Sequence, residues 1–165
     1  KDKIVAVVGG GDNALEEALF LTKFARKVYL IHRRDKLRGV RILQERVFTN
    51  PKIEVVWNSV VTEIIGQDRL EKVKLFNRVT QKESELSLDG LFISIGMDPN
   101  TAFLRGLLEL NEYGEIKVSS QMETSRSGIF AAGDVTNVCP KQVATASGSG
   151  VAAALAVEEY LSRQE

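Results

Sequence analysis

Cysteine is almost absent from this sequence, because Cys139 is the only one among 165 residues. A single thiol excludes a disulfide within these residues and excludes a Cys-x-x-Cys redox pair among them. We interpret Cys139, which stands directly before Pro140, as an inert small residue.

Long hydrophobic runs and an excess of one charge are missing as well. No apolar stretch approaches the roughly 20 residues that span a bilayer, so we expect no membrane segment. Lysine plus arginine and aspartate plus glutamate both number 22, so the composition implies no nucleic-acid partner. Lys1-Asp2-Lys3 leads directly into an apolar run, which predicts no signal peptide and a cytoplasmic protein. Because the chain does not start with Met, we expect it to begin inside a longer one.

A glycine-rich turn follows the first apolar run, Ile4–Val8. It reads Gly9-Gly10-Gly11-Asp12-Asn13-Ala14 and matches the G-x-G-x-x-A pattern of dinucleotide-binding turns. Gly9 permits a tight turn, Gly11 lets the backbone approach a pyrophosphate, and Ala14 is small enough for a helix to pack on the strand. The helix N-terminus adds free N–H groups and a partial positive charge, both of which suit an anion. The alternative is a tight turn in some other βαβ unit.

Basic residues follow the second predicted strand, Val28–Ile31. In an NAD site an acidic residue normally stands here and holds the ribose hydroxyls. This sequence instead has His32-Arg33-Arg34 and then Arg38. Guanidinium groups match the geometry of a phosphate, so the cluster predicts a 2′-phosphate and hence NADP(H). Two alternatives are a solvated charge run and an NAD site in which Asp35 is a displaced acid.

Alternating strand and helix patterns predict an α/β fold. Over residues 1–97 we expect a Rossmann-like domain with a β-meander, and the apolar run 91–95 predicts a buried parallel strand that returns to the sheet. The other expected elements are helices over about 12–26 and 40–48 and strands over 53–58, 60–65, 71–77 and 84–88.

The pattern changes at Gly96–Asn100, which we interpret as a link between domains. Over residues 98–165 we expect a second, incomplete domain. Its predicted elements are a short helix over 102–110, strands over 115–118 and 128–132, and a long helix from Gln142 to about Ser162. Gly148 and Gly150, in the first turns of that helix, indicate either close approach of a backbone or ligand or tight helix–strand packing.

Several of these motifs, taken in order, resemble the low-molecular-weight thioredoxin reductases. Gly9–Leu19 followed by Ile31–Asp35 resembles the NADPH domain of that family. Gly96–Thr101 resembles its interdomain crossover, and Thr124–Val135 resembles its second flavin motif. Lys141–Ala146, followed by Gly148-Ser149-Gly150, is similar to the helix opening that meets the flavin ring. The resemblance covers essentially the whole chain.

The resemblance implies two cofactors, NADPH and FAD. Asp134 would bond the ribityl or pyrophosphate side of the flavin, and the backbone N–H groups of Gln142 and Val143 would face its electron-rich N1/O2 edge. Lys141 stands where the family usually has arginine, which keeps the charge but loses the bidentate fork. The cofactor-binding residues that we expect are Gly9, Gly10, Gly11, Asp12, Asn13, Ala14, His32, Arg33, Arg34, Arg38, Gly96, Gly133, Asp134, Lys141, Gln142 and Val143.

In this family a hydride passes from NADPH to FAD, and a Cys-x-x-Cys pair then passes the electrons to thioredoxin or a similar protein disulfide. The resemblance implies that this chain is the C-terminal portion of such an oxidoreductase. It would hold a complete NADPH domain and the C-terminal part of the FAD-binding domain, with no catalytic residue and no metal site. We expect the isolated chain to be inactive. The incomplete domain should expose apolar surface and be less stable, or pair with a second copy in a homodimer.

Two rival interpretations remain open from the sequence. One is a fragment of a thioredoxin-reductase-like ferredoxin–NADP reductase, which has no cysteine pair. The other is an NADP-binding module without redox chemistry, which would contain no flavin.

Overall fold

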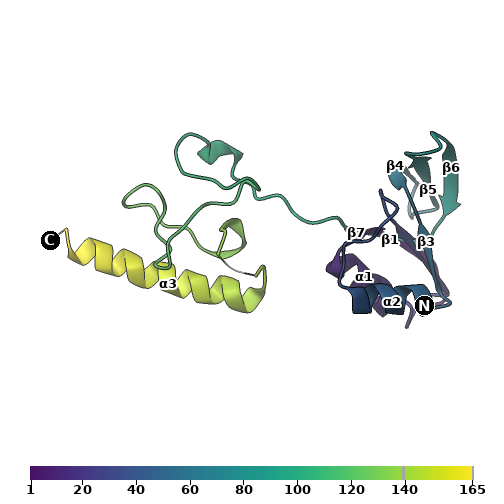
Figure 1. The fold of residues 1–165 in the computed structure, drawn as a ribbon, viewed down its shortest axis with the longest axis horizontal. Coiled ribbons are helices and arrows are strands. Elements are labelled where there is room, and N and C mark those ends of the chain that lie inside the picture. The colour runs from purple at the N-terminus through teal and green to yellow at the C-terminus, as the bar shows by residue number, and fades with distance from the viewer. Residues whose placement is uncertain (139, 165) are drawn as a thin grey trace. The chain divides into compact units, whose positions relative to one another are not determined.

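The computed structural model describes residues 1–138 and 140–164, so the interpretation of Cys139 as inert lies outside the described residues. The chain divides into two compact units, Lys1–Gly96 and Met97–Glu165, which we call unit 1 and unit 2. The mixed α/β fold that the sequence predicted is confirmed (Figure 1).

Unit 1 is built on a four-stranded parallel sheet with the strand order β3-β2-β1-β7. The chain moves outward from the central strand β1 through β2 to β3 and then crosses to β7 on the other side of β1. A reversal of this kind leaves a crevice at the carboxyl ends of the strands on either side of it, where ligands bind in open α/β sheets. The strands are β1 (Ile4–Gly9), β2 (Lys27–Ile31), β3 (Ile53–Val56) and β7 (Gly90–Ser94).

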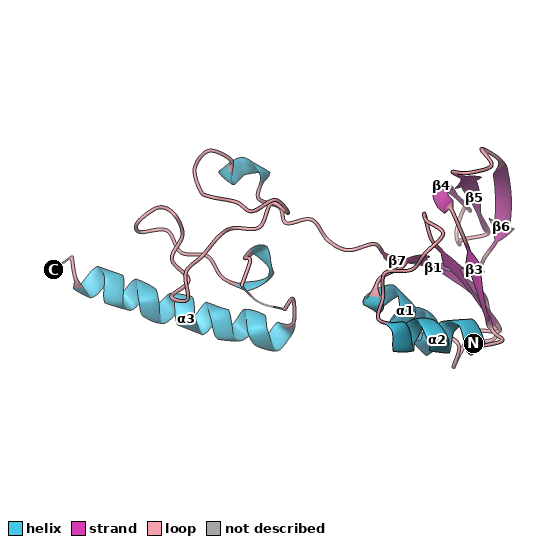
Figure 2. Cartoon of the chain, in the orientation of Figure 1, coloured by secondary structure: helices cyan, strands magenta, loops and turns pink. Residues whose placement is uncertain are grey.

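Two layers cover the faces of this sheet, as Figure 2 shows. Helices α1 (Asp12–Leu21) and α2 (Arg41–Thr49) lie on one face. The antiparallel sheet of β4 (Ser59–Ile65), β5 (Lys72–Asn77) and β6 (Glu83–Ser87) lies on the other. Side chains alternate between the two faces along a strand, so the central strand β1 packs apolar side chains against both layers.

The buried residues confirm this arrangement. Val5 and Val7 of β1 pack in one core cluster with residues of α1 and α2. Ala6, which lies between them, packs in a second cluster with Val73 and Leu75 of β5. The Rossmann-like sheet with a β-meander, predicted from the sequence, is therefore confirmed.

Two expectations for unit 1 need correction. Helix α1 ends at Leu21 and not near residue 26. The Thr22 hydroxyl donates to the Leu19 carbonyl, and the next two backbone N–H groups donate to carbonyls three residues earlier, which replaces the α-helical pattern. Strand β7 is parallel, as predicted, but it is not buried: Phe92 is 37% exposed and Ile93 56%. Within the described residues β7 pairs only with β1, so one of its edges is uncovered.

Unit 2 has little regular structure apart from one long helix, α3 (Val143–Ser162), which confirms the predicted helix. The predicted helix over 102–110 shortens to the 3₁₀ helix η1 (Ala102–Leu104), and a second 3₁₀ helix, η2, covers Gly133–Val135. The strands predicted over 115–118 and 128–132 are wrong, because these segments form only isolated bridges. A strand requires a continuous hydrogen-bonded neighbour, and the described part of unit 2 contains none.

Helix α3 exposes much of its apolar surface, as the sequence predicted for an incomplete domain. Val151 is 63% exposed and Leu155 61%. A Cβ added at Gly148 or Gly150 would meet no described atom within 4 Å, so tight packing inside the described structure does not explain either glycine. Among the described residues, no helix is long and apolar enough to cross a membrane.

Candidate functional site

The glycine turn (residues 9–11) connects β1 to α1 at the carboxyl end of the parallel sheet. Gly9 is the last residue of β1 and pairs with Ser94 at the end of β7. A Cβ at Gly9 would lie 2.4 Å from the Ser94 carbonyl oxygen and 2.5 Å from the Cβ of Ala14. Ala14 is fully buried. Gly9 and Ala14 therefore allow α1 to pack closely on the end of the sheet.

Gly11 has a different role. It precedes the first residue of α1 with φ −94° and ψ −178°, an extended conformation open to any residue. A Cβ at this position would meet no described atom within 4 Å. The space in front of the α1 N-terminus is therefore open, and the N–H groups of the first helical turn make this position suitable for an anion.

Gly10 lies over the side chain of His32. A Cβ at Gly10 would lie 2.3 Å from the imidazole ring of His32. His32 is buried, with only 5% of its surface exposed. The ring nitrogens face two backbone carbonyls: Nδ1 is 2.9 Å from the Gly9 oxygen, and Nε2 is 3.1 Å from the Lys36 oxygen. The structure thus places His32 beneath the glycine turn and in contact with the segment that follows β2.

That segment, the arginine loop (residues 33–40), is hydrogen-bonded to the glycine turn. The Gly10 carbonyl accepts from the Arg38 N–H at 2.7 Å and from the Gly39 N–H at 3.0 Å. The carboxylate of Asp12 accepts from the Val40 N–H at 2.7 Å. Sequence reasoning placed Asp12 in the phosphate turn but missed this bond, because nothing local in the sequence pairs residues 12 and 40.

Arg33, Arg34 and Arg38 are exposed residues of this loop. Within residues 1–138 and 140–164, no carboxylate forms a salt bridge with any of them. Asp35 is exposed in the same loop. The structure therefore joins the two segments in which the sequence predicted the site: the glycine turn, with open space at Gly11, and the loop that carries the exposed arginines.

A second contact holds β7 against α1. The Ser94 hydroxyl donates a hydrogen bond to the Glu17 carboxylate, and Glu17 is only partly exposed. Ser94 and Glu17 lie 77 positions apart in the sequence, so this contact is another that the sequence alone did not predict. Since Ser94 also lies against Gly9, the bond helps to fix the end of β7 beside the glycine turn.

In unit 2 the residues predicted to meet a flavin gather where η2 lies on α3. Gly133 adopts a left-handed φ of 78°, and its N–H donates to the Ser149 hydroxyl at 2.9 Å. Asp134 is exposed, and Val143, the first residue of α3, is 85% exposed. The Gln142 N–H, just before the helix, donates to the Thr145 hydroxyl at 3.3 Å.

Lys141 is engaged within the unit. Its ammonium group lies 2.6 Å from a Glu115 carboxylate oxygen and donates to the Asp134 carbonyl at 2.8 Å. The hydrogen bond from Lys141, with a second from Asn111, holds the pKa of Glu115 below its usual value. Gly96 is the last residue of unit 1 and has φ 98°.

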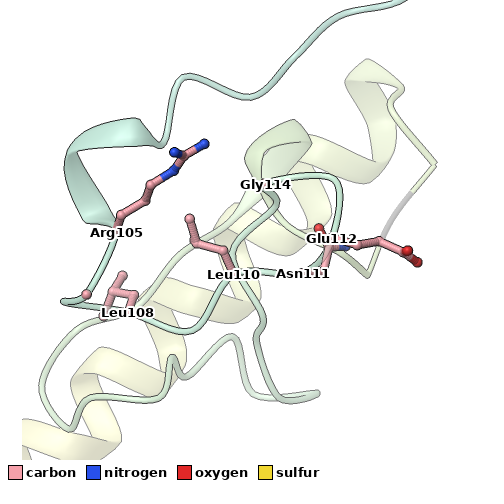
Figure 3. A pocket seen from close by; sticks show the side chains of 7 residues that line it. Arg105, Leu108, Leu110, Asn111, Glu112 and Gly114 are labelled. Atoms are coloured by element: carbon pink, nitrogen blue, oxygen red, sulfur yellow. The ribbon is translucent and has the colours of Figure 1, made fainter.

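A cavity of about 300 Å³ elsewhere in unit 2 has a different lining (Figure 3). Arg105, Leu108, Leu110, Asn111 and Glu112 are among the residues around it, and none of them is a predicted site residue. No described group of three or more His, Cys, Asp or Glu residues could hold a metal ion.

Comparison with known proteins assigns the chain to a family. Residues 1–150 match the model of the pyridine nucleotide-disulphide oxidoreductases. A thioredoxin reductase of Streptomyces clavuligerus is 46% identical over 162 residues, which are 98% of this chain and 50% of that protein. Thioredoxin reductase 2 of Arabidopsis thaliana is 48% identical over 98% of this chain and 43% of its own length. The chain thus spans about half the length of the curated relatives it matches.

Solved structures agree with these relatives. The thioredoxin reductase of Lactococcus lactis superposes with a TM-score of 0.80 and is 40% identical, covering 99% of this chain and 54% of that one. The thioredoxin reductase of T. acidophilum superposes with a TM-score of 0.76 at 33% identity, covering 100% of this chain and 54% of its own. The glycine turn, the parallel sheet and these matches together show that the chain belongs to the pyridine nucleotide-disulphide oxidoreductase family.

Proposed function

We propose that this chain is the NADPH-binding part of a thioredoxin-disulfide reductase together with the C-terminal part of its FAD-binding domain. Residues 1–97 bind NADPH, and residues 98–165 contribute to the flavin site. In the whole protein, NADPH held by residues 1–97 would supply a hydride to FAD, and the electrons would then reduce a protein disulfide. The names of the relatives and their roughly twofold greater length support this assignment.

One observation carries the NADPH assignment: the opening at Gly11 and the exposed guanidinium groups belong to one hydrogen-bonded structure. The N-terminus of α1 binds the pyrophosphate there. Arg33, Arg34 and Arg38 bind the 2′-phosphate, which NADPH has and NADH lacks.

The flavin residues have a supporting role. Asp134 and the start of α3 are exposed and bind the cofactor, and Gly133 lets η2 lie close to the helix. Because the Lys141 ammonium group already bonds Glu115 and the Asp134 carbonyl, Lys141 positions the loop of Asp134. The chain's own contribution is therefore to bind and orient the cofactors, which supply the redox chemistry.

The test replaces Arg33 and Arg34 with alanine and measures the affinities for NADPH and NADH by fluorescence titration. Each lost charge-assisted contact costs roughly 1.5–3 kcal/mol, so NADPH affinity should fall by about tenfold or more per contact. NADH affinity should change little. The matched control replaces Arg69 and Arg78, two exposed arginines outside the arginine loop, and should leave both affinities near those of the unchanged chain.

Equal losses for the two nucleotides would contradict the NADPH assignment and favour an NAD site built on Asp35. The flavin content after expression of the longer protein separates a reductase from a nucleotide-binding module, because only the reductase is yellow.

We also propose a cytoplasmic location, thioredoxin or a similar protein disulfide as the electron acceptor, and pairing of two copies in a homodimer. The relatives' names support the acceptor. NADPH-dependent reduction of thioredoxin by the longer protein tests it. The 165 residues alone, with one cysteine, should give no turnover.

A further inference from the structure

We propose that Asp12 determines the preference for NADPH over NADH as a positioning residue, by holding the arginine loop against the glycine turn. This inference rests on the proposed function, since it assigns a role within the same site. Asp12 itself makes its hydrogen bond to the protein backbone, so it acts on the 2′-phosphate through the loop that carries the arginines.

The hydrogen bond from Val40 to Asp12 holds the end of the arginine loop in place. Asp12 is the first residue of α1, and its Oδ1 accepts from the Val40 N–H at 2.7 Å. Val40 directly precedes α2, so the bond links the starts of the two helices. A hydrogen bond to a carboxylate is stronger than one between neutral groups.

The neighbouring residues show that the loop lies directly on Asp12. A Cβ added at Gly39 would be 2.4 Å from the Leu15 side chain and 3.0 Å from the Asp12 carboxylate. The Gly10 carbonyl bonds the N–H groups of Arg38 and Gly39, and His32 bonds the Lys36 carbonyl nearer the start of the loop. The glycine turn and the arginine loop are therefore joined at several points, and Asp12 supplies the one at the end of the loop.

This arrangement predicts a selective effect on the two nucleotides. NADPH must contact the glycine turn with its pyrophosphate and the arginine loop with its 2′-phosphate at the same time. NADH needs only the glycine turn. A looser loop therefore weakens NADPH binding and leaves NADH binding nearly unchanged, because ordering the loop then costs free energy at the moment of binding.

Simple electrostatics predicts the opposite sign. Asp12 carries a negative charge beside a site for anions, so removing that charge should strengthen the binding of both nucleotides. A loss of NADPH affinity on removal of an acid can therefore be distinguished from a general charge effect.

The experiment measures NADPH and NADH affinities of the 165-residue chain by fluorescence titration. Asp12→Ala should lower NADPH affinity by about tenfold, the loss expected for one hydrogen bond to a charged group, with NADH affinity within about twofold of the unchanged chain. Asp12→Asn should retain NADPH affinity, because the amide oxygen still accepts from the Val40 N–H. Asp35→Ala removes an exposed acid of the same loop that makes no bond to Val40, and it should not weaken NADPH binding.

A second variant breaks the same bond from the other side. Val40→Pro removes the N–H donor and keeps the Asp12 charge, and the φ of −60° at Val40 suits proline. It should reproduce the selective loss, and it decides the question if circular dichroism shows that Asp12→Ala does not fold. Unchanged or tighter NADPH binding in Asp12→Ala, equal losses for both nucleotides, or a loss in Asp12→Asn as large as in Asp12→Ala would overturn the inference. A parent chain that binds the two nucleotides equally would instead overturn the proposed function.

Discussion

Alanine at Gly11 should weaken nucleotide binding without disturbing the fold. The backbone at Gly11 is extended with φ −94°, which alanine adopts without strain, and the added Cβ meets no described atom within 4 Å. We therefore expect the free energy of unfolding to change by less than about 0.5 kcal/mol, as for other substitutions that touch nothing.

The same methyl group occupies the space that a pyrophosphate needs. A phosphate oxygen must come within about 3 Å of the backbone N–H groups to form a hydrogen bond, whereas a methyl carbon keeps other heavy atoms about 3.5–4.0 Å away. Affinity for NADPH and for NADH should fall by at least about tenfold, equivalent to about 1.4 kcal/mol. The loss should be equal for the two nucleotides, since both carry the pyrophosphate.

Gly9→Ala should have the opposite effect on stability and serves as the matched comparison for Gly11→Ala. Its Cβ would lie 2.4 Å from the backbone oxygen of Ser94 and 2.5 Å from the buried Ala14 Cβ, and neither atom belongs to a flexible side chain. Overpacking of this kind typically costs about 1–3 kcal/mol. Gly9→Ala should therefore lower the urea midpoint of unit 1, and Gly11→Ala should not.

Urea unfolding followed by circular dichroism and nucleotide titration by fluorescence test both variants. If Gly11→Ala bound NADPH as tightly as the parent chain, the pyrophosphate would not lie at the glycine turn. If Gly9→Ala unfolded at the same urea concentration as the parent, the packing of α1 on the strand ends would be looser than the structure shows.

The remaining predictions concern acid stability and local unfolding. Lys141, with help from Asn111, holds the pKa of Glu115 below its usual value of 4.5, so this pair should stabilise unit 2 fully above about pH 4.5 and lose that effect as the pH falls toward the lowered pKa. Thermal unfolding followed through the helix signal should show this loss, and Glu115→Gln should remove the acid dependence; an unchanged acid dependence would mean that another group is responsible. Hydrogen exchange should be slow in β1 and β2, which have a strand on each side, and faster around Gly133 and Asp134. Uniform protection in both units would contradict this prediction and indicate that unit 2 has found a partner.

Short-range patterns in the sequence determined much of the secondary structure of this protein. The alternation of apolar residues along the strands, the glycine turn at residues 9–11 and the helical pattern that begins at Gln142 each depend on neighbours in the sequence. The fold class, the β-meander and helix α3 could therefore be predicted. The basic residues after β2 could be recognised for the same reason, since strand-end positions follow directly from the strand.

Only the tertiary structure decided which residues meet. The bond from Val40 to Asp12, the burial of His32 beneath Gly10, and the bond from Ser94 to Glu17 join residues far apart in the sequence. No local pattern encodes these contacts, because they depend on how α1 and the arginine loop pack at the end of the sheet.

The wrong predictions have the same physical origin. The apolar run 128–132 has the composition of a strand, but a strand forms only where another strand offers its N–H and C=O groups, and the described part of unit 2 offers none. Strand β7 is apolar yet exposed, because the burial of its side chains depends on what packs against the faces of this edge strand. The sequence by itself thus determined the secondary-structure propensity of each segment. The tertiary structure decided which segments have a neighbour to pair with or pack against.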